Sequence, residues 1–136
     1  MAKIRLVTVM TLDGFLPDEN CPLTQWLDTD RRGFRYWRER STFTLPTGYP
    51  MIDLINRKER TDGSRVYLAE ISDTARVELL RALKVYDLVD EWVVYSLPHT
   101  QGAGAHLTDG FTTARWELKK SRTFRNGICC RLYVRQ

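Results

Sequence analysis

Three aromatic side chains in the first third of the sequence have the chemistry to hold a flat heterocycle. Phe34 and Trp37 fall three residues apart, on one side of a helix expected at about residues 31–39, and Trp26 precedes them. Large rings of this kind commonly line the pockets of planar ligands. The alternative interpretation is that all three are core residues covering a sheet, because buried aromatics are common in a domain of this size.

The same expected helix carries a basic stripe formed by Arg31, Arg35 and Arg38, at positions i, i+4 and i+7. A guanidinium group binds phosphate through a planar fork, which lysine cannot do. The stripe could therefore contact the phosphate of a substrate, of a cofactor or of nucleic acid, and nucleic acid is the weakest of these hypotheses. The alternative is a solvated helix face, which is common on surface helices.

Cysteines and histidines are too few and too scattered to suggest a metal centre. Cys129 and Cys130 are neighbours in a strand-like run and Cys21 lies far from them, so we expect reduced, buried thiols. His99 and His106 flank a glycine-containing loop. No Cys/His spacing indicates zinc, and no arrangement of Ser, His and Asp supports hydrolase chemistry.

Apolar runs predict the strands that must position these residues. The run at residues 4–10 is apolar on both faces, which is typical of a strand inside a sheet covered on both sides. Further strands are expected at residues 51–55, 65–71 and 91–97.

Two helices are expected between these strands. Residues 28–30 supply N-cap residues for the helix at about 31–39, and residues 16–27 read as an irregular loop. Residues 72–73 cap a second helix, whose apolar stripe consists of Ala75, Leu79, Ala82, Leu83 and Tyr86.

The C-terminus is typical of a β-hairpin. Its arms run over residues 116–125 and 128–135, joined by Asn126 and Gly127, a pair that favours a type I′ turn because both residues tolerate positive φ. Alternation in the second arm predicts one buried and one wet face. The order of elements predicts an α/β fold with a mostly parallel sheet flanked by helices and an antiparallel end.

Composition agrees with a folded protein of ordinary size. The chain has 136 residues, 43% of them hydrophobic and 28% charged, with a net charge of +4. This predicts a single domain over residues 1–136. No apolar run is long enough to cross a bilayer and no secretion signal is visible, so we expect a cytoplasmic protein without membrane partners.

Several segments together resemble a known family. VMTLDGF at residues 9–15 resembles the first strand and turn of dihydrofolate-reductase-like proteins. LVDEWVVYSLP at residues 88–98 and GAGAHL at residues 102–107 resemble the late strand and glycine-rich loop of the reductase domain of the bifunctional riboflavin-biosynthesis deaminase-reductase. The closing pair of strands fits the ending of that domain. The resemblance implies a dihydrofolate-reductase-like fold.

This resemblance also implies an activity, namely hydride transfer from NADPH to a pteridine- or pyrimidine-like small molecule, and a homodimer. Asp13 is then the catalytic and substrate-binding candidate, with Trp26, Phe34 and Trp37 as further substrate contacts. The expected cofactor contacts are Thr11, Gly14, Arg40, Thr42, Gly102 and Gly104. For Asp13 and Gly14, an ordinary turn pair is the alternative interpretation.

A non-catalytic family member is the alternative function. Glu39 stands where the family carries a glycine before its phosphate-binding arginine, and Glu70 and Asp73 stand where it carries a pair of glycines. A carboxylate repels a pyrophosphate. The alternative is therefore a small-ligand-binding or assembly domain whose dinucleotide site has been lost.

Overall fold

A computed structural model describes residues 1–136. It contains six strands, four α-helices and one turn of 3₁₀ helix, called η1. In chain order they are β1 (Lys3–Met10), α1 (Pro22–Thr29), α2 (Phe34–Glu39), β2 (Phe43–Thr44), α3 (Met51–Arg60), β3 (Val66–Ile71), η1 (Thr74–Arg76), α4 (Val77–Val85), β4 (Glu91–Ser96), β5 (Trp116–Thr123) and β6 (Cys129–Arg135). No helix has the length and apolar character needed to cross a membrane.

All six strands form one sheet in the order β2-β3-β1-β4-β6-β5. The strands β2, β3, β1 and β4 run parallel, and β6 and β5 follow as an antiparallel hairpin. The expected α/β architecture, mostly parallel with an antiparallel end, is therefore confirmed. The central strand β1 is buried along almost its whole length, as a strand apolar on both faces requires.

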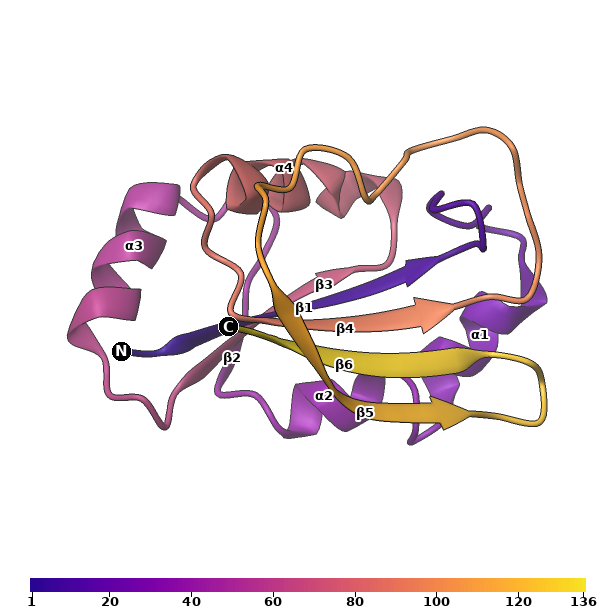
Figure 1. Ribbon diagram of the computed structural model, residues 1–136, viewed down its shortest axis with the longest axis horizontal. Helices are drawn as coiled ribbons and strands as arrows, with labels where there is room; N and C mark the ends of the chain where they lie inside the picture. The colour runs from indigo at the N-terminus through magenta and orange to yellow at the C-terminus, as the bar shows by residue number, and fades with distance from the viewer.

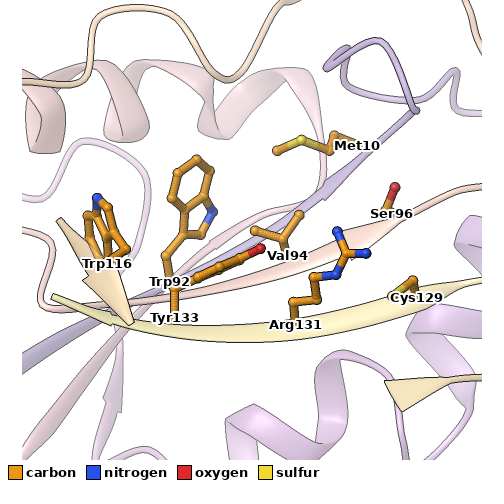
Figure 2. Close-up of a pocket in the computed structure, with 8 residues that line it drawn as sticks. All are labelled: Met10, Trp92, Val94, Ser96, Trp116, Cys129, Arg131 and Tyr133. Carbon is orange, nitrogen blue, oxygen red and sulfur yellow. The ribbon is translucent and has the colours of Figure 1, made fainter. Parts of the chain in front are cut away.

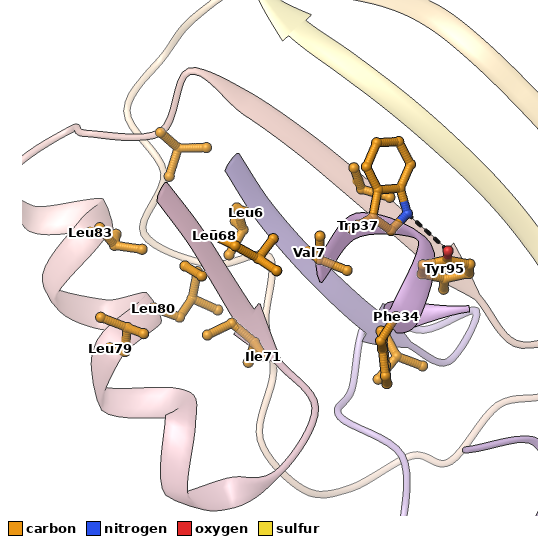
Figure 3. Packing of buried hydrophobic residues seen from close by; sticks show 14 of the residues in the cluster. Leu6, Val7, Phe34, Trp37, Leu68, Ile71, Leu79, Leu80, Leu83 and Tyr95 are labelled. Carbon is orange, nitrogen blue, oxygen red and sulfur yellow. Dashed lines mark hydrogen bonds between the residues drawn. The ribbon is translucent and has the colours of Figure 1, made fainter. Parts of the chain in front are cut away.

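Helices cover both faces of the parallel strands. Figure 1 shows α1 and α2 on one side of the sheet and α3 and α4 on the other. Alternate residues of β1 serve the two layers, so Val7 points toward α2 and Leu6 toward α4 (Figure 3). The antiparallel strands β5 and β6 extend beyond these helices, which leaves both of their faces only partly covered.

A buried hydrogen bond joins α2 to the sheet within the core. Trp37 donates its indole N–H to the hydroxyl oxygen of Tyr95 at 2.9 Å, and the Tyr95 hydroxyl donates to the carbonyl of Arg32 at 2.7 Å (Figure 3). Phe34 packs edge-on against the Tyr95 ring, with centroids 5.7 Å apart. The polar atoms of these aromatics are therefore satisfied although they lie among apolar residues.

The strand predicted at residues 51–55 is wrong, because these residues form the first half of α3. Met51, Leu54 and Ile55 lie at i, i+3 and i+4 and pack against the core on one face. This is helical spacing, and Pro50 precedes the helix in an extended conformation. The run of five residues was too short to distinguish the two periods.

The loop predicted at residues 16–27 is also wrong in its second half, where α1 begins at Pro22. Proline suits the first turn of a helix because its missing N–H would have no intrahelical partner. The next helix, α2, then begins at Phe34, three residues later than expected. Gly33 precedes it in a non-helical conformation, with ψ at −143°, and packs so closely on α1 that a Cβ atom there would lie 2.2 Å from the carbonyl oxygen of Leu27.

Because α2 starts late, the basic stripe does not form as predicted. Arg31 precedes α2 and lies off the helix. Arg35 pairs with Glu39 on the surface, and Arg38 reaches Glu70 on β3. The three arginines therefore have separate surroundings.

The second predicted helix is present as η1 followed by α4, but its stripe differs at both ends. Leu79, Leu80 and Leu83 are the buried residues of α4. Ala75 and Tyr86 are exposed. The helical segment begins with the 3₁₀ turn η1, and the carboxylate of Asp73 makes no capping hydrogen bond to it.

The predicted hairpin is confirmed, and its turn type is corrected. Only Gly127 of the turn pair has positive φ, at 90°. The N–H of Gly127 donates to the carbonyl oxygen of Phe124, and the N–H of Phe124 donates to the carbonyl oxygen of Ile128. This is a type I turn followed by a left-handed glycine. Cys129 and Cys130 are unpaired as expected, but they are half-buried, because neither face of β6 is fully covered.

Candidate functional site

The parallel strands β1, β3 and β4 end at the same edge of the sheet, where ligands of open α/β folds bind. A polar cleft of about 320 Å³ lies there, bounded by the loop after β1, by α1 and by the link between β3 and η1. We call it the acidic cleft, because its charged lining residues are Asp18, Glu19, Asp28, Glu70, Asp73, Arg38 and Arg76.

Glu70 forms the centre of an ion-pair cluster in this cleft. Its side chain is 2% exposed and accepts two hydrogen bonds from Arg38, at 2.7 and 2.8 Å. Arg76 and the hydroxyl of Ser72 donate to the same carboxylate at 3.3 and 3.1 Å. Both guanidinium groups of the cleft are therefore already paired with a buried anion.

Besides the exposed Asp18 and Glu19, Asp28 and Asp73 are carboxylates of the cleft with unused acceptor capacity. Asp73 Oδ1 is shielded from solvent and has no hydrogen-bond partner. Asp28 has only a 3.9 Å contact with Arg38. Desolvation in the cleft raises the pKa of Asp28 above its ordinary value, and repulsion from Glu70 and Asp73 adds to this against the opposing effect of Arg38. Such a site favours a ligand that is cationic or rich in hydrogen-bond donors.

Asp13, the expected catalytic residue, fastens two loops together. Its carboxylate accepts the Thr11 hydroxyl at 2.5 Å and the backbone N–H groups of Gln101 and Gly102 at 3.1 and 2.7 Å. The hydrogen bond from Thr11, followed by those from the two backbone groups, lowers the pKa of Asp13. The carboxylate thus connects the turn after β1 to the loop after β4.

The other expected residues of this edge take part in the same junction. Thr11 and Gly14 are buried, and Gly14 has a φ of +85°, with its hypothetical Cβ only 2.9 Å from the His106 ring. Gly102 binds Asp13, and Gly104 borders an outer extension of the acidic cleft. The structure therefore brings these four residues together around two loops.

Arg40 and Thr42 lie at the opposite edge of the sheet. Thr42 Oγ1 accepts the N–H of Val66 at the start of β3, at 3.0 Å. The Arg40 guanidinium lies 3.6 Å from the ring centroid of Tyr36. Since these contacts are at the amino ends of the parallel strands, the six expected cofactor contacts do not converge on one site.

The three expected aromatic contacts are also dispersed. Phe34 and Trp37 are core residues, 1% and 7% exposed, in agreement with the second interpretation of these rings. The edge of Phe34 still forms part of the acidic cleft. Trp26 lies farther along the same side of the sheet, with its ring centroid 5.0 Å from that of Phe124.

Neither a family model nor a curated protein matches the sequence. Solved structures do. A protein from Shewanella assigned to riboflavin biosynthesis superposes with a TM-score of 0.55 and 17% identity, over 100% of this chain and 99% of the other. Dihydrofolate reductase from Enterococcus faecalis, solved with NADP(H), gives 0.59 and 9%, over 98% and 96%. The chain has the dihydrofolate-reductase fold.

A bifunctional enzyme shares this fold over part of its length. It is the diaminohydroxyphosphoribosylaminopyrimidine deaminase/5-amino-6-(5-phosphoribosylamino)uracil reductase from Thermotoga maritima, with a TM-score of 0.61 and 15% identity. The chain covers 57% of that enzyme and is itself covered over 99%. At this identity the dihydrofolate-reductase fold is what the comparison shows.

The residues at the carboxyl edge do not fit a dinucleotide. A pyrophosphate at the end of β3 would meet Glu70 and Asp73, both anionic, and the nearby guanidinium groups are neutralised by Glu70. A single 3₁₀ turn follows β3 there, in place of a glycine-opened helix N-terminus that could receive a phosphate.

Sequence reasoning missed Asp28 as a site residue. It treated residues 28–30 as the cap of a following helix, whereas Asp28 lies in the last turn of α1. The available signal was Pro22, whose position favours a helix start. A helix from Pro22 places Asp28 among residues that can face the sheet edge.

Proposed function

We propose that this protein is a non-catalytic binding domain with the dihydrofolate-reductase fold. Its ligand is a pteridine- or pyrimidine-like ring that carries amino groups, held in the acidic cleft without participation of NADPH. A cleft of about 320 Å³ lies at the lower end of the range for small-molecule sites and suits one or two fused rings.

The pairing of both cleft arginines with Glu70 carries this proposal. It leaves only carboxylates among the charged groups free to bind a ligand, Asp28 and Asp73 included, and carboxylates are acceptors. An amino-substituted ring, especially a protonated one, offers donors to a carboxylate through charge-assisted hydrogen bonds. A phosphate offers only negative charge, so the same observation weighs against a dinucleotide.

A second candidate is the NADPH-dependent reduction of such a ring. The structures of similar fold, two of which are named as reductases, favour it. It requires NADPH affinity in the micromolar range of ordinary enzyme ligands.

Isothermal titration calorimetry separates the two candidates. With 2,4-diaminopyrimidine and pterin as probes, we expect binding that Asp28→Asn weakens about tenfold, since one charge-assisted hydrogen bond is lost. Glu78→Gln is the matched control, because Glu78 is an exposed residue of α4 that pairs only with Arg81. Micromolar NADPH binding that Asp28→Asn leaves intact, together with oxidation of NADPH on adding either ring, would replace this proposal by the reductase.

We also propose that the protein forms a homodimer through the hairpin face opposite α2. A shallow apolar hollow of about 270 Å³ lies on this face (Figure 2). Trp92, Trp116 and Tyr133 are half-buried there, and the neighbouring Leu118 is 48% exposed. Exposed apolar side chains gathered on the last strands of a sheet suit a self-complementary interface.

A further inference from the structure

A second groove lies on the side of the sheet that carries α1 and α2, between α2 and the C-terminal hairpin. Its volume is about 310 Å³. Tyr95, Cys130 and Leu132 form its floor, and Arg32, Lys120 and Arg122 provide its positive charges. We call it the hairpin groove. It is separate from the acidic cleft, with which it shares no lining residue.

The irregular register of β5 places two cations in this groove. Lys120 lies opposite Leu132 and Arg122 opposite Cys130, after a shift between Leu118 and Lys120. Both side chains therefore lie on the groove face of the hairpin, beside the residues that form the floor. Neither makes a salt bridge, whereas Arg32 is paired with Asp30 at 2.9 Å. The groove thus holds two positive charges that no carboxylate balances.

A single aromatic ring concentrates this charge further. The guanidinium groups of Arg32 and Arg122 lie 5.3 and 5.0 Å from the ring centroid of Phe124. Asp30 balances the charge of Arg32, so Arg122 is the member of this pair whose positive charge stays available to an anion. Tyr36 is half-buried and supplies a further aromatic ring to the lining, whereas Trp37 and Phe124, 7% and 8% exposed, each present only an edge.

The floor of the groove is neutral near pH 7. Burial raises the pKa of the Cys130 thiol to about 11 and raises the pKa of the Tyr95 phenol as well. No aspartate or glutamate lines the groove. Nothing in the lining therefore opposes the approach of an anion.

We propose that the hairpin groove binds a planar aromatic ring that carries a phosphate, of the class of a nucleoside monophosphate. The phosphate pairs with Lys120 and Arg122. The ring lies against Tyr36 and the exposed edges of Trp37 and Phe124. A volume of about 310 Å³ accommodates one such molecule. Its size favours a small ligand over a nucleic-acid strand, which needs a surface extending over several nucleotides.

The test is a calorimetric titration at low salt with AMP, adenosine and inorganic phosphate as separate ligands. The variant is Lys120→Glu combined with Arg122→Glu. Lys119→Glu is the matched control, because Lys119 is an adjacent cation that pairs with Glu117 and does not line the groove. We expect AMP to bind, and the double variant to weaken it at least about tenfold while the control changes it less than about twofold.

The three probes separate charge from stacking. Adenosine and phosphate should each bind at least about tenfold more weakly than AMP, since each lacks one half of the recognition. AMP should also shift the NMR signals of the Trp37 and Phe124 rings, and phosphate should not. Unchanged urea unfolding of the double variant shows that a loss of binding is not a loss of fold.

Other outcomes overturn the proposal. Equal affinity for AMP and phosphate indicates an unspecific anion site, and an equal loss in Lys119→Glu indicates diffuse surface charge. Binding of a single-stranded octanucleotide without binding of AMP indicates a nucleic-acid surface. The double variant also keeps the two sites distinguishable, because NADPH binding that disappears in it belongs to the hairpin groove and not to the acidic cleft.

Discussion

Arg38 on α2 and Glu70 on β3 form a two-point ion pair, with Nε–Oε1 and Nη2–Oε2 separations of 2.7 and 2.8 Å. The pair joins the helical layer to the carboxyl end of the sheet. It also decides the chemistry of the acidic cleft, because it occupies the guanidinium group that would otherwise attract an anion. Stability and ligand preference therefore depend on the same contact.

Removing this guanidinium should destabilise the fold. We expect Arg38→Met to lower the free energy of unfolding by about 1–3 kcal/mol, since Glu70 stays buried with Arg76 as its remaining partner. Arg35→Met on the same helix removes an exposed pair and should change it by less than about 0.5 kcal/mol. Urea unfolding measures both variants, and equal losses would show that the Glu70 contact contributes nothing special.

Asp13→Asn should loosen the junction between the loops after β1 and β4. Because the folded pKa of Asp13 is lowered, its stabilising contribution is present above the ordinary value of 3.8 and is lost as pH falls through the folded value. The stability difference between wild type and variant should therefore shrink below pH 3.8.

Hydrogen exchange provides a local reading of the same junction. The amide of Gly102, which donates to Asp13 at 2.7 Å, should exchange faster in Asp13→Asn. Asp53→Asn, at an exposed residue of α3, is the control and should leave this amide unchanged. Unaltered exchange of Gly102 in Asp13→Asn would leave the carboxylate free for another role.

Tyr95→Phe should lower stability, because it removes a buried hydroxyl that both accepts and donates a hydrogen bond. Its removal leaves the indole N–H of Trp37 and the carbonyl of Arg32 without their partner, which we expect to lower the free energy of unfolding by about 1–3 kcal/mol. Tyr86→Phe, at a residue that is 54% exposed, should lie within about 0.5 kcal/mol of wild type. Equal stability of the two variants by urea unfolding would contradict this assignment.

The proposed homodimer depends on the apolar hairpin face. Wild-type protein should show twice the mass of one chain in light scattering, and Tyr133→Arg should show the mass of a monomer, since a buried unpaired charge opposes association. Tyr86→Arg, at the exposed residue that follows α4, supplies the control and should remain dimeric. A monomeric wild type at micromolar concentration would refute the interface.

Regular elements with a strong local pattern were predictable. The apolar run of β1, the final hairpin and the mostly parallel sheet with an antiparallel end follow from burial periodicity and turn residues, and they agree with the dihydrofolate-reductase fold. The short amphipathic helices were harder, because α1 and the first half of α3 span too few residues to establish a period. Packing against the sheet selects the helix in both cases.

Site residues were the least predictable. Glu70 and Asp73 were predicted from the sequence to repel the pyrophosphate of a dinucleotide, and the structure places both in the acidic cleft. Nothing in the sequence indicated that Arg38, 32 residues earlier, would bind Glu70, or that Arg40 would lie at the opposite edge of the sheet. Residue type identifies the groups capable of chemistry, but their neighbours depend on how distant segments cross.

The sequence by itself determined the layers of this protein, because apolar spacing and turn residues act over a few positions. Only the tertiary structure decided which charged side chains are held in ion pairs and which have no partner. Glu70 takes up both arginines of the acidic cleft, whereas Lys120 and Arg122 stay unpaired in the hairpin groove. The physical reason is that an ion pair needs contact within about 4 Å, and such contacts between elements far apart in sequence are fixed by the fold alone.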